Sequence, residues 1–214
     1  MVFIKVRDVS SQRHEISDQG TKDCTSSCVS SIVMLMDTSD ETLAATAAAG
    51  DRDAFAALLA RHYDRIFGLC FRLTGARAEA EDLAQDICMA LPVKLGSYRQ
   101  VARFTTWLYR VTVNAAHDRR RRTATRIKAA DGWGDWEIAR QAEISEAEAS
   151  QDWLAATMAR LTPELRDTVA LTLGEELSQA EAAEVLGVSE GTVAWRMSEV
   201  KKRLREMARA EGML

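Results

Sequence analysis

The segment that most restricts the fold is 178–205, which reads as two helices joined by a tight turn. Ser178 and Glu181 have the spacing of a capping box, which satisfies free backbone N–H groups at a helix start. Gly187 stands where the first helix needs a left-handed residue to end, and Ser189 can cap the second helix. This pattern predicts a helix-turn-helix, a unit whose second helix enters the DNA major groove.

Charge is distributed unevenly along the chain, although the net charge is only −4. Segment 119–128 has six basic residues and no acidic one, whereas 131–152 has seven acidic residues against Arg140 alone. Separated charge blocks predict different faces for different partners, and the basic blocks favour the phosphates of nucleic acid. The alternative for each block is an ordinary solvated helix face. A further basic run follows the helix-turn-helix: Arg196, Lys201, Lys202, Arg203, Arg205 and Arg209.

The composition predicts an all-α protein, because Pro is scarce and no long β-branched alternation occurs. The chain has no apolar run long enough to span a membrane and no secretion signal at its start, so we expect a cytoplasmic protein. Cys70 and Cys88 fall on apolar helix faces and are predicted core residues. Cys24 and Cys28 leave zinc binding or redox sensing open, although the ligand set for zinc is incomplete.

Helical periodicity begins at Thr38, after a segment 1–37 that we expect to be disordered. Thr38 with Glu41 has capping-box spacing, and Asp51 can cap the next helix. That second helix carries one apolar stripe that includes His62, which is predicted to pack in the core. The stripe consists of Phe55, Leu58, Leu59, His62, Ile66, Leu69, Cys70 and Leu73.

Two more helices are predicted before the acidic segment. The first runs from about 78 to 91 with an acidic outer face, and Pro92 closes or kinks it. The second runs from about 103 to 122, with Trp107 on its apolar side and a polar, aromatic and basic side that suits single-stranded DNA. Near the C-terminus, Thr162 is a predicted cap ahead of Pro163. The core face of that last helix consists of Leu161, Leu165, Val169 and Leu173.

Segments 80–99 and 102–122 together resemble the second domain of bacterial sigma factors of the extracytoplasmic-function (ECF) class, in the sigma-70 family. Segment 161–206 resembles their fourth domain, and the resemblance covers about residues 38 to 210. It implies two small helical domains joined by a flexible acidic linker. The boundaries are 1–37 for the extension, 38–123 for domain two, 124–151 for the linker and 152–214 for domain four.

The resemblance implies a transcription initiation factor that binds core RNA polymerase and promoter DNA, helps to melt the duplex and is controlled by an anti-sigma factor. The implied core-binding residues are Glu81, Asp82, Gln85 and Asp86. The implied minus-ten residues are Arg103, Trp107, Tyr109, Arg110, Asn114, Asp118, Arg119, Arg120, Arg121 and Arg122. The implied minus-35 residues are Ser189, Glu190, Thr192, Ala194, Trp195, Arg196, Lys201 and Lys202.

Ala194 and Trp195 depart from the family pattern, in which a basic residue and a small polar residue usually stand. Loss of that cation weakens contact with phosphate or base and puts the usual minus-35 preference in question, but not the class of function.

Functions other than initiation account for less of the sequence. No nucleophile–base pair, metal set or phosphate loop supports an enzyme, so we expect no catalytic residue, cofactor or small-molecule substrate. One alternative is a sigma-like decoy that sequesters an anti-sigma factor, although the basic block 119–128 argues against it. Another is a simple helix-turn-helix repressor formed by 152–214 alone, which leaves the tryptophan-containing and acidic helices unexplained. A repressor should bind DNA specifically by itself, whereas a sigma factor should bind poorly without polymerase.

Overall fold

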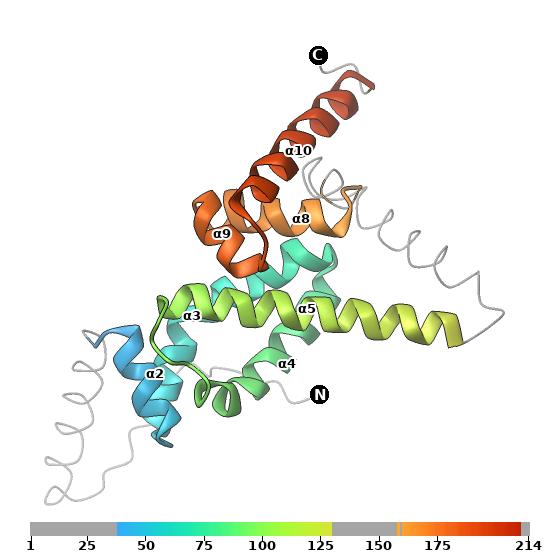
Figure 1. The fold of residues 1–214 in the computed structure, drawn as a ribbon. Helices are drawn as coiled ribbons and strands as arrows, with labels where there is room; N and C mark the ends of the chain where they lie inside the picture. Colours follow the sequence, from blue (N-terminus) through green and yellow to red (C-terminus); the bar gives the residue numbers. More distant parts are fainter. Residues whose placement is uncertain (1–37, 130–157, 159, 211–214) are drawn as a thin grey trace, which may run out of the picture. The chain divides into compact units, whose positions relative to one another are not determined.

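The computed structural model describes residues 38–129, 158 and 160–210, and Figure 1 shows that its regular elements are helices. Helices α2 to α5 form the part that we call domain two, and α8 to α10 with the short π-helix η1 form the part that we call domain four. The predicted all-α class is confirmed for these residues. They all belong to one compact unit that begins at Thr38.

Helices α2 (Asp40–Ala48) and α3 (Arg52–Thr74) open domain two, and their caps follow the sequence with one correction. Asp51 caps α3 as predicted, and Gly75 ends it in the left-handed conformation at φ 81°. The predicted box of Thr38 with Glu41 is wrong by one residue, because the Ser39 hydroxyl accepts from the Thr42 N–H at 3.3 Å. A serine in extended conformation can therefore serve as the cap, which leaves the next carboxylates free for other bonds.

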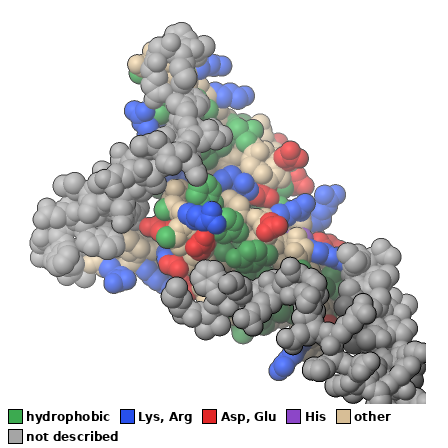
Figure 2. Space-filling view, turned by 180° about the vertical axis from the view of Figure 1, so that it is seen from behind, with side chains coloured by type: hydrophobic (Ala, Val, Ile, Leu, Met, Phe, Trp, Pro, Cys, Tyr) green, Lys and Arg blue, Asp and Glu red, His purple; other side chains and the backbone are tan. Residues whose placement is uncertain are grey.

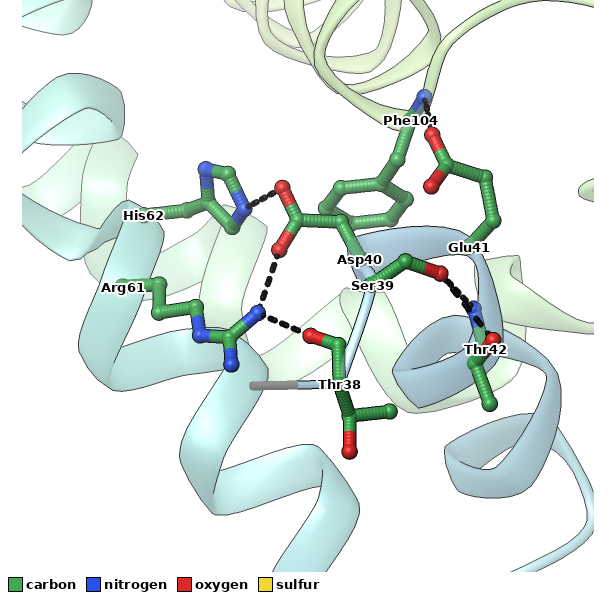
Figure 3. A network of polar contacts seen from close by, with 8 residues as sticks. All are labelled: Thr38, Ser39, Asp40, Glu41, Thr42, Arg61, His62 and Phe104. Atoms are coloured by element: carbon green, nitrogen blue, oxygen red, sulfur yellow. Dashed lines mark hydrogen bonds and ion pairs between the residues drawn. The ribbon is translucent and has the colours of Figure 1, made fainter. Parts of the chain in front are cut away.

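Those carboxylates tie three helices together, as Figure 3 shows. Asp40 accepts from Arg61 at 2.9 Å and lies 2.8 Å from His62 Nε2, so it joins α2 to α3. Glu41 accepts from the Phe104 N–H at 3.3 Å, at the start of the fourth helix. His62 is buried, as predicted for a core histidine, and burial lowers its pKa even though Asp40 acts to raise it.

Helices α4 (Arg77–Leu95) and α5 (Phe104–Ala129) complete domain two, and both are longer than predicted. Helix α4 continues past Pro92, where a proline removes one backbone hydrogen bond. Buried Leu91 and Leu95 hold this last turn against the core, which explains why the helix does not end there. Helix α5 extends beyond Arg122 through the first residues of the segment expected to be a linker.

Domain two is held together by the apolar faces of its four helices. Leu69 and Cys70 of α3 are fully buried, and burial raises the pKa of the Cys70 thiol to about 12. Cys70 is therefore a packed, unreactive thiol at neutral pH, as predicted for a core residue. Other fully enclosed side chains are Leu43, Ile66, Leu73, Leu83, Ile87, Leu95, Phe104, Leu108 and Val113.

Domain four begins with α8 (Pro163–Val169), which continues directly into η1 (Ala170–Gly174). Thr162 occupies the cap position, but its side chain makes no capping bond. Leu165 and Val169 pack with Leu161 and Val200 as predicted. Leu173 does not belong to this core, because the wider π turn changes the angle between successive side chains.

The last two helices are α9 (Gln179–Leu186) and α10 (Glu190–Ala210), which Figure 1 shows as a short and a long helix. The predicted capping box is present, with Ser178 Oγ accepting from the Glu181 N–H at 3.2 Å and the Glu181 carboxylate accepting from the Ser178 N–H at 3.0 Å. Gly187 takes the left-handed conformation at φ 66°, and buried Val193 fixes α10 against the preceding helices. The helix-turn-helix predicted from the sequence is confirmed.

The predictions for the extension 1–37, for Cys24 and Cys28, and for most of the acidic linker lie outside the described residues.

Candidate functional site

The acidic face of α4 is exposed along its length and carries all four residues predicted to bind polymerase, Glu81, Asp82, Gln85 and Asp86. The side chains of Asp82 and Asp86 retain 70% and 74% of their accessible surface, so they are open to a partner. Arg119 of α5 reaches them, with Nη2 3.2 Å from Asp82 Oδ2 and Nη1 3.6 Å from Asp86 Oδ2. The acidic face of α4 and the basic block at Arg119 therefore meet at one edge.

Helix α5 presents most of its predicted minus-ten residues to solvent. Arg103, just before the helix, and Arg110 and Asn114 on it are exposed. Asp118, Arg121 and Arg122 are exposed farther along it, where Arg121 pairs with Asp118 at 3.1 Å. Exposed cations and one amide, Asn114, therefore follow one another along α5, and the cations Arg110 and Arg121 lie beside the acids Glu184 and Asp118.

Trp107 is half-buried in an aromatic cluster rather than free on the surface. Its ring lies 5.3 Å from that of Tyr98 and 5.6 Å from that of Phe104, measured between centroids. Contacts of this kind stabilise the packing and fix the orientation of the indole. Trp107 thus presents one rigid edge, and Tyr98 is a neighbour that the sequence analysis did not single out.

Tyr109 is buried, and the prediction that it lies on the open aromatic surface is wrong for this conformation. Burial and a hydrogen bond with Glu175 raise the pKa of its phenol. Glu175 follows η1 in domain four, so a residue far along the chain covers Tyr109. No local sequence signal reveals this contact, because it depends on how distant helices pack.

The four consecutive arginines 119–122 have different surroundings. Arg119 pairs with α4 as described, whereas Arg120 donates two bonds to Asp167 of α8, at 2.7 and 3.1 Å. His117 Nε2 also lies 2.8 Å from Asp167. Figure 2 shows Lys and Arg side chains next to Asp and Glu side chains on the face drawn. The sequence analysis did not single out Asp167 or His117. A charged residue between the apolar positions Leu165 and Val169 of a short core helix nevertheless indicates a buried ionic contact.

The first turns of α10 expose the predicted minus-35 residues. The Ser189 hydroxyl accepts from the Thr192 N–H at 3.2 Å and thus caps the helix. Glu190 and Ala194 are exposed, and Trp195 retains 64% of its accessible surface. Arg196 is half-buried beside it, and Lys201 and Lys202 are exposed one turn later.

Within the described ranges, no group of three or more His, Cys, Asp or Glu side chains is arranged to hold a metal ion. None of the described helices is both long and apolar enough to cross a bilayer.

Comparison with known proteins identifies the family of this chain. The family model for Sigma-70 region 2 matches residues 58–126, and that for Sigma-70, region 4 matches residues 151–204. These matches cover α5 with the acidic face of α4, and the helix-turn-helix with most of α10.

Whole-chain relatives extend the likeness to both domains. The ECF RNA polymerase sigma factor SigW of Bacillus subtilis is 30% identical over 75% of this chain and 91% of its own length. The ECF RNA polymerase sigma factor SigM of Mycobacterium tuberculosis is 36% identical over 79% of this chain and 84% of its own. The solved structure of CnrH in complex with the cytosolic domain of CnrY has a TM-score of 0.58 and 30% identity, and covers 80% of this chain and 97% of that one. This chain therefore belongs to the ECF class of RNA polymerase sigma factors in the sigma-70 family.

Proposed function

We propose that this protein binds core RNA polymerase in the bacterial cytoplasm and directs it to promoters, without catalytic activity of its own. The observation that carries the proposal is the pairing, in one chain, of an exposed cationic helix α5 with a capped helix-turn-helix. Two DNA-contacting elements on separate domains suit a factor that reads two promoter elements. A repressor that uses only domain four would leave α4 and α5 without a role.

The acidic face of α4 is the proposed contact with core polymerase. The side chains of Asp82 and Asp86 are the open carboxylates of this face, with 70% and 74% of their surface accessible. Exposed charges of one sign steer a partner of opposite charge and set the register of the contact. Arg119 neutralises the inner edge of this face, so polymerase would compete with Arg119 for the same carboxylates.

Helix α5 is the proposed reader of the minus-ten element. Arg103, Arg110 and Asn114 supply exposed donors, and Trp107 supplies an aromatic edge held by its neighbours. Melted bases cost a few kcal/mol each to unstack, which cationic and aromatic contacts offset. Arg121 and Arg122 would contact the backbone, because phosphate contacts position a strand without reading its sequence.

The first turns of α10 are the proposed reader of the minus-35 element in the major groove. Glu190, Thr192 and Arg196 would contact base edges or phosphates near the helix start. Ala194 and Trp195 replace a cation and a small polar residue with apolar groups. Such groups favour contact with the thymine methyl over a guanine edge. We therefore propose a minus-35 preference that differs from the usual one.

An anti-sigma factor is the proposed regulator. CnrH was solved with the cytosolic domain of CnrY bound, and it shares 30% of its sequence with this chain. We propose that a comparable partner covers the polymerase-binding and promoter-reading faces here. Co-purification from the native cell that recovers polymerase but no inhibitor would count against this part of the proposal.

Reconstituted transcription tests the proposal directly. The full chain is added to sigma-free bacterial core polymerase with a library of genomic promoters, and new transcripts are sequenced. Specific transcripts would establish initiation and reveal both promoter elements. A folded chain that neither binds core nor yields transcripts would refute the proposal and favour the decoy.

Two sets of variants separate core binding from promoter opening. Asp82→Lys with Asp86→Lys should weaken core binding at least about tenfold, equivalent to about 1.4 kcal/mol. Asp64→Lys, an exposed acid on α3, is the matched control and should leave core affinity unchanged. Replacing 119–122 with alanine should reduce open-complex yield more than core binding. Equal losses in both assays would contradict the separation of the two surfaces.

A further inference from the structure

The first turn of α5 has no side-chain cap at its own start. The Trp107 N–H donates to the Arg103 carbonyl at 3.2 Å, so Arg103 occupies the cap position and Phe104 is the first helical residue. A guanidinium group carries donors only, so the Arg103 side chain cannot accept a bond from the free N–H groups of this turn. Arg103 therefore leaves these groups to an acceptor outside the helix.

Glu41 of α2 supplies that acceptor from 63 residues away in the chain. Its Oε1 atom accepts from the Phe104 N–H at 3.3 Å, and Figure 3 shows the carboxylate reaching the backbone of Phe104 from α2. A carboxylate at this end of a helix also complements the partial positive charge of the helix dipole. Glu41 thus does for α5 what Asp51, the residue just before α3, does for α3.

Helix α2 is itself fixed, which gives Glu41 a defined position. Asp40, the preceding residue, accepts from Arg61 at 2.9 Å and lies 2.8 Å from His62 Nε2. Arg61 also donates to the Thr38 carbonyl at 2.7 Å. These contacts join the start of α2 to the middle of α3, as Figure 3 shows, so α3 supports the carboxylate that caps α5.

Phe104 transmits this support to the surface of α5. Its side chain is 1% exposed, and its ring centroid lies 5.2 Å from that of His62 and 5.6 Å from that of Trp107. Glu41 holds the backbone of Phe104, and the neighbouring rings hold its side chain. Arg103 and Trp107, which both belong to the proposed minus-ten reader, lie on either side of Phe104 in the same turn.

We propose that Glu41 is a positioning residue for the minus-ten reader, so that α2 forms part of that reader; this inference rests on the function proposed above. The match to Sigma-70 region 2 begins at residue 58, and α2 lies outside it. Without the cap, the first turn of α5 frays, and a melted DNA strand must order it on binding. The apparent affinity then falls in proportion to the fraction of molecules in which the turn is ordered.

Hydrogen exchange of the full chain tests the positioning itself. Glu41→Ala should speed exchange of the backbone N–H groups of residues 104–107 at least about fivefold, the size expected for loss of one capping interaction. The other described helices should exchange as in the wild type. Asp53→Ala is the matched control, because it removes an exposed first-turn acid of α3 whose cap, Asp51, remains in place.

Two conservative variants separate the bond from the mere presence of a side chain. Glu41→Gln keeps the length of the side chain and an acceptor oxygen, so it should behave like the wild type. Glu41→Asp keeps the charge but is one methylene shorter, so it should behave like Glu41→Ala. If circular dichroism shows that Glu41→Ala is misfolded, the Asp variant decides the question in the same assays.

Promoter binding tests the functional part with holoenzyme formed by saturating core polymerase with each variant. Glu41→Ala and Glu41→Asp should weaken binding of a single-stranded minus-ten oligonucleotide, taken from a promoter found by transcription, at least about fivefold. Affinity for a minus-35 duplex and for core should not change, whereas a general loss of stability would lower all three. Wild-type minus-ten affinity in both variants, or equal losses on the two promoter elements, would overturn the proposal.

Failure of this inference can be told apart from failure of the proposed function. A wild-type chain that transcribes with core polymerase, together with unchanged minus-ten binding by the Ala and Asp variants, would leave the initiation role intact and remove the positioning role. A wild-type chain without transcripts would refute the function and with it any role of Glu41 in promoter reading. Exchange needs neither polymerase nor DNA, so it reports in either case whether Glu41 holds α5.

Discussion

The π-helix η1 reverses which leucine is expected to be buried in domain four. Sequence periodicity places Leu173 in the core, whereas the structure buries Leu171. A regular helix would continue the stripe of Leu165 and Val169 to Leu173 and leave Leu171 off the core side. In the structure Leu171 is 0% exposed and Leu173 is 64% exposed. The wider turn changes the side-chain angles, and contacts of η1 with α3 and α9 enclose Leu171. We therefore expect alanine at Leu171 to destabilise the protein and alanine at Leu173 to have little effect. The stripe predicts the reverse.

The magnitude follows from burial. Leu171→Ala removes a fully enclosed side chain and should lower the free energy of unfolding by about 2–5 kcal/mol. Leu173→Ala removes a side chain that is mostly in water and should change it by less than about 0.5 kcal/mol. With a urea m-value of about 2 kcal/mol/M, the first variant should shift the unfolding midpoint by about 1–2 M.

The assay is urea unfolding of the full chain, followed by circular dichroism and tryptophan fluorescence. Leu165→Ala serves as calibration, because Leu165 is 4% exposed and packs in the core of domain four on either interpretation. Leu171→Ala should resemble Leu165→Ala, and Leu173→Ala should resemble the wild type. A larger loss for Leu173→Ala than for Leu171→Ala would refute the π turn and restore the regular stripe.

Three further predictions concern caps, protonation and phosphate contacts. Ser178→Ala removes the cap of α9 and should cost about 1 kcal/mol in thermal unfolding; an unchanged melting temperature would contradict this. Burial holds the pKa of His62 below 6.5, so the unfolded chain takes up the proton first and stability falls as the pH drops below 6.5. His62→Gln should reduce that fall in melts taken above and below this pH, and an identical pH dependence would count against it. Lys201→Ala with Lys202→Ala should reduce the salt dependence of minus-35 duplex binding by the holoenzyme by about two counterions, with an unaltered slope as the contrary result.

Local signals predicted much of domain four and of the acidic and basic helices. Ser178, Gly187 and Ser189 act within one turn of themselves, so their roles depend only on neighbours in the chain. The exposed acids of α4 and the buried His62 follow helical periodicity for the same reason. Local interactions are thus the ones that the sequence pattern predicts best, although Thr162 makes no capping bond with its side chain.

Features that depend on packing could not be predicted in this way. Pro92 reads as a helix end or a kink, and buried Leu91 and Leu95 decide that α4 continues beyond it. Ser39 and Thr38 are equally good caps by type, and the choice depends on Glu41, which bonds to the start of α5 instead. Tyr109 reads as a surface aromatic because its cover comes from a segment far along the chain.

Arg119 is engaged by α4, Arg120 by α8 and Arg121 by Asp118, so three of the four consecutive arginines are partly neutralised within the molecule. Each internal partner must be displaced before the arginine contacts a phosphate, which lowers the affinity of the free chain for DNA. Polymerase binding to the acidic face of α4 would release Arg119, because polymerase would compete for Asp82 and Asp86. This release would restore part of the cationic surface, so promoter binding would depend in part on prior assembly with polymerase.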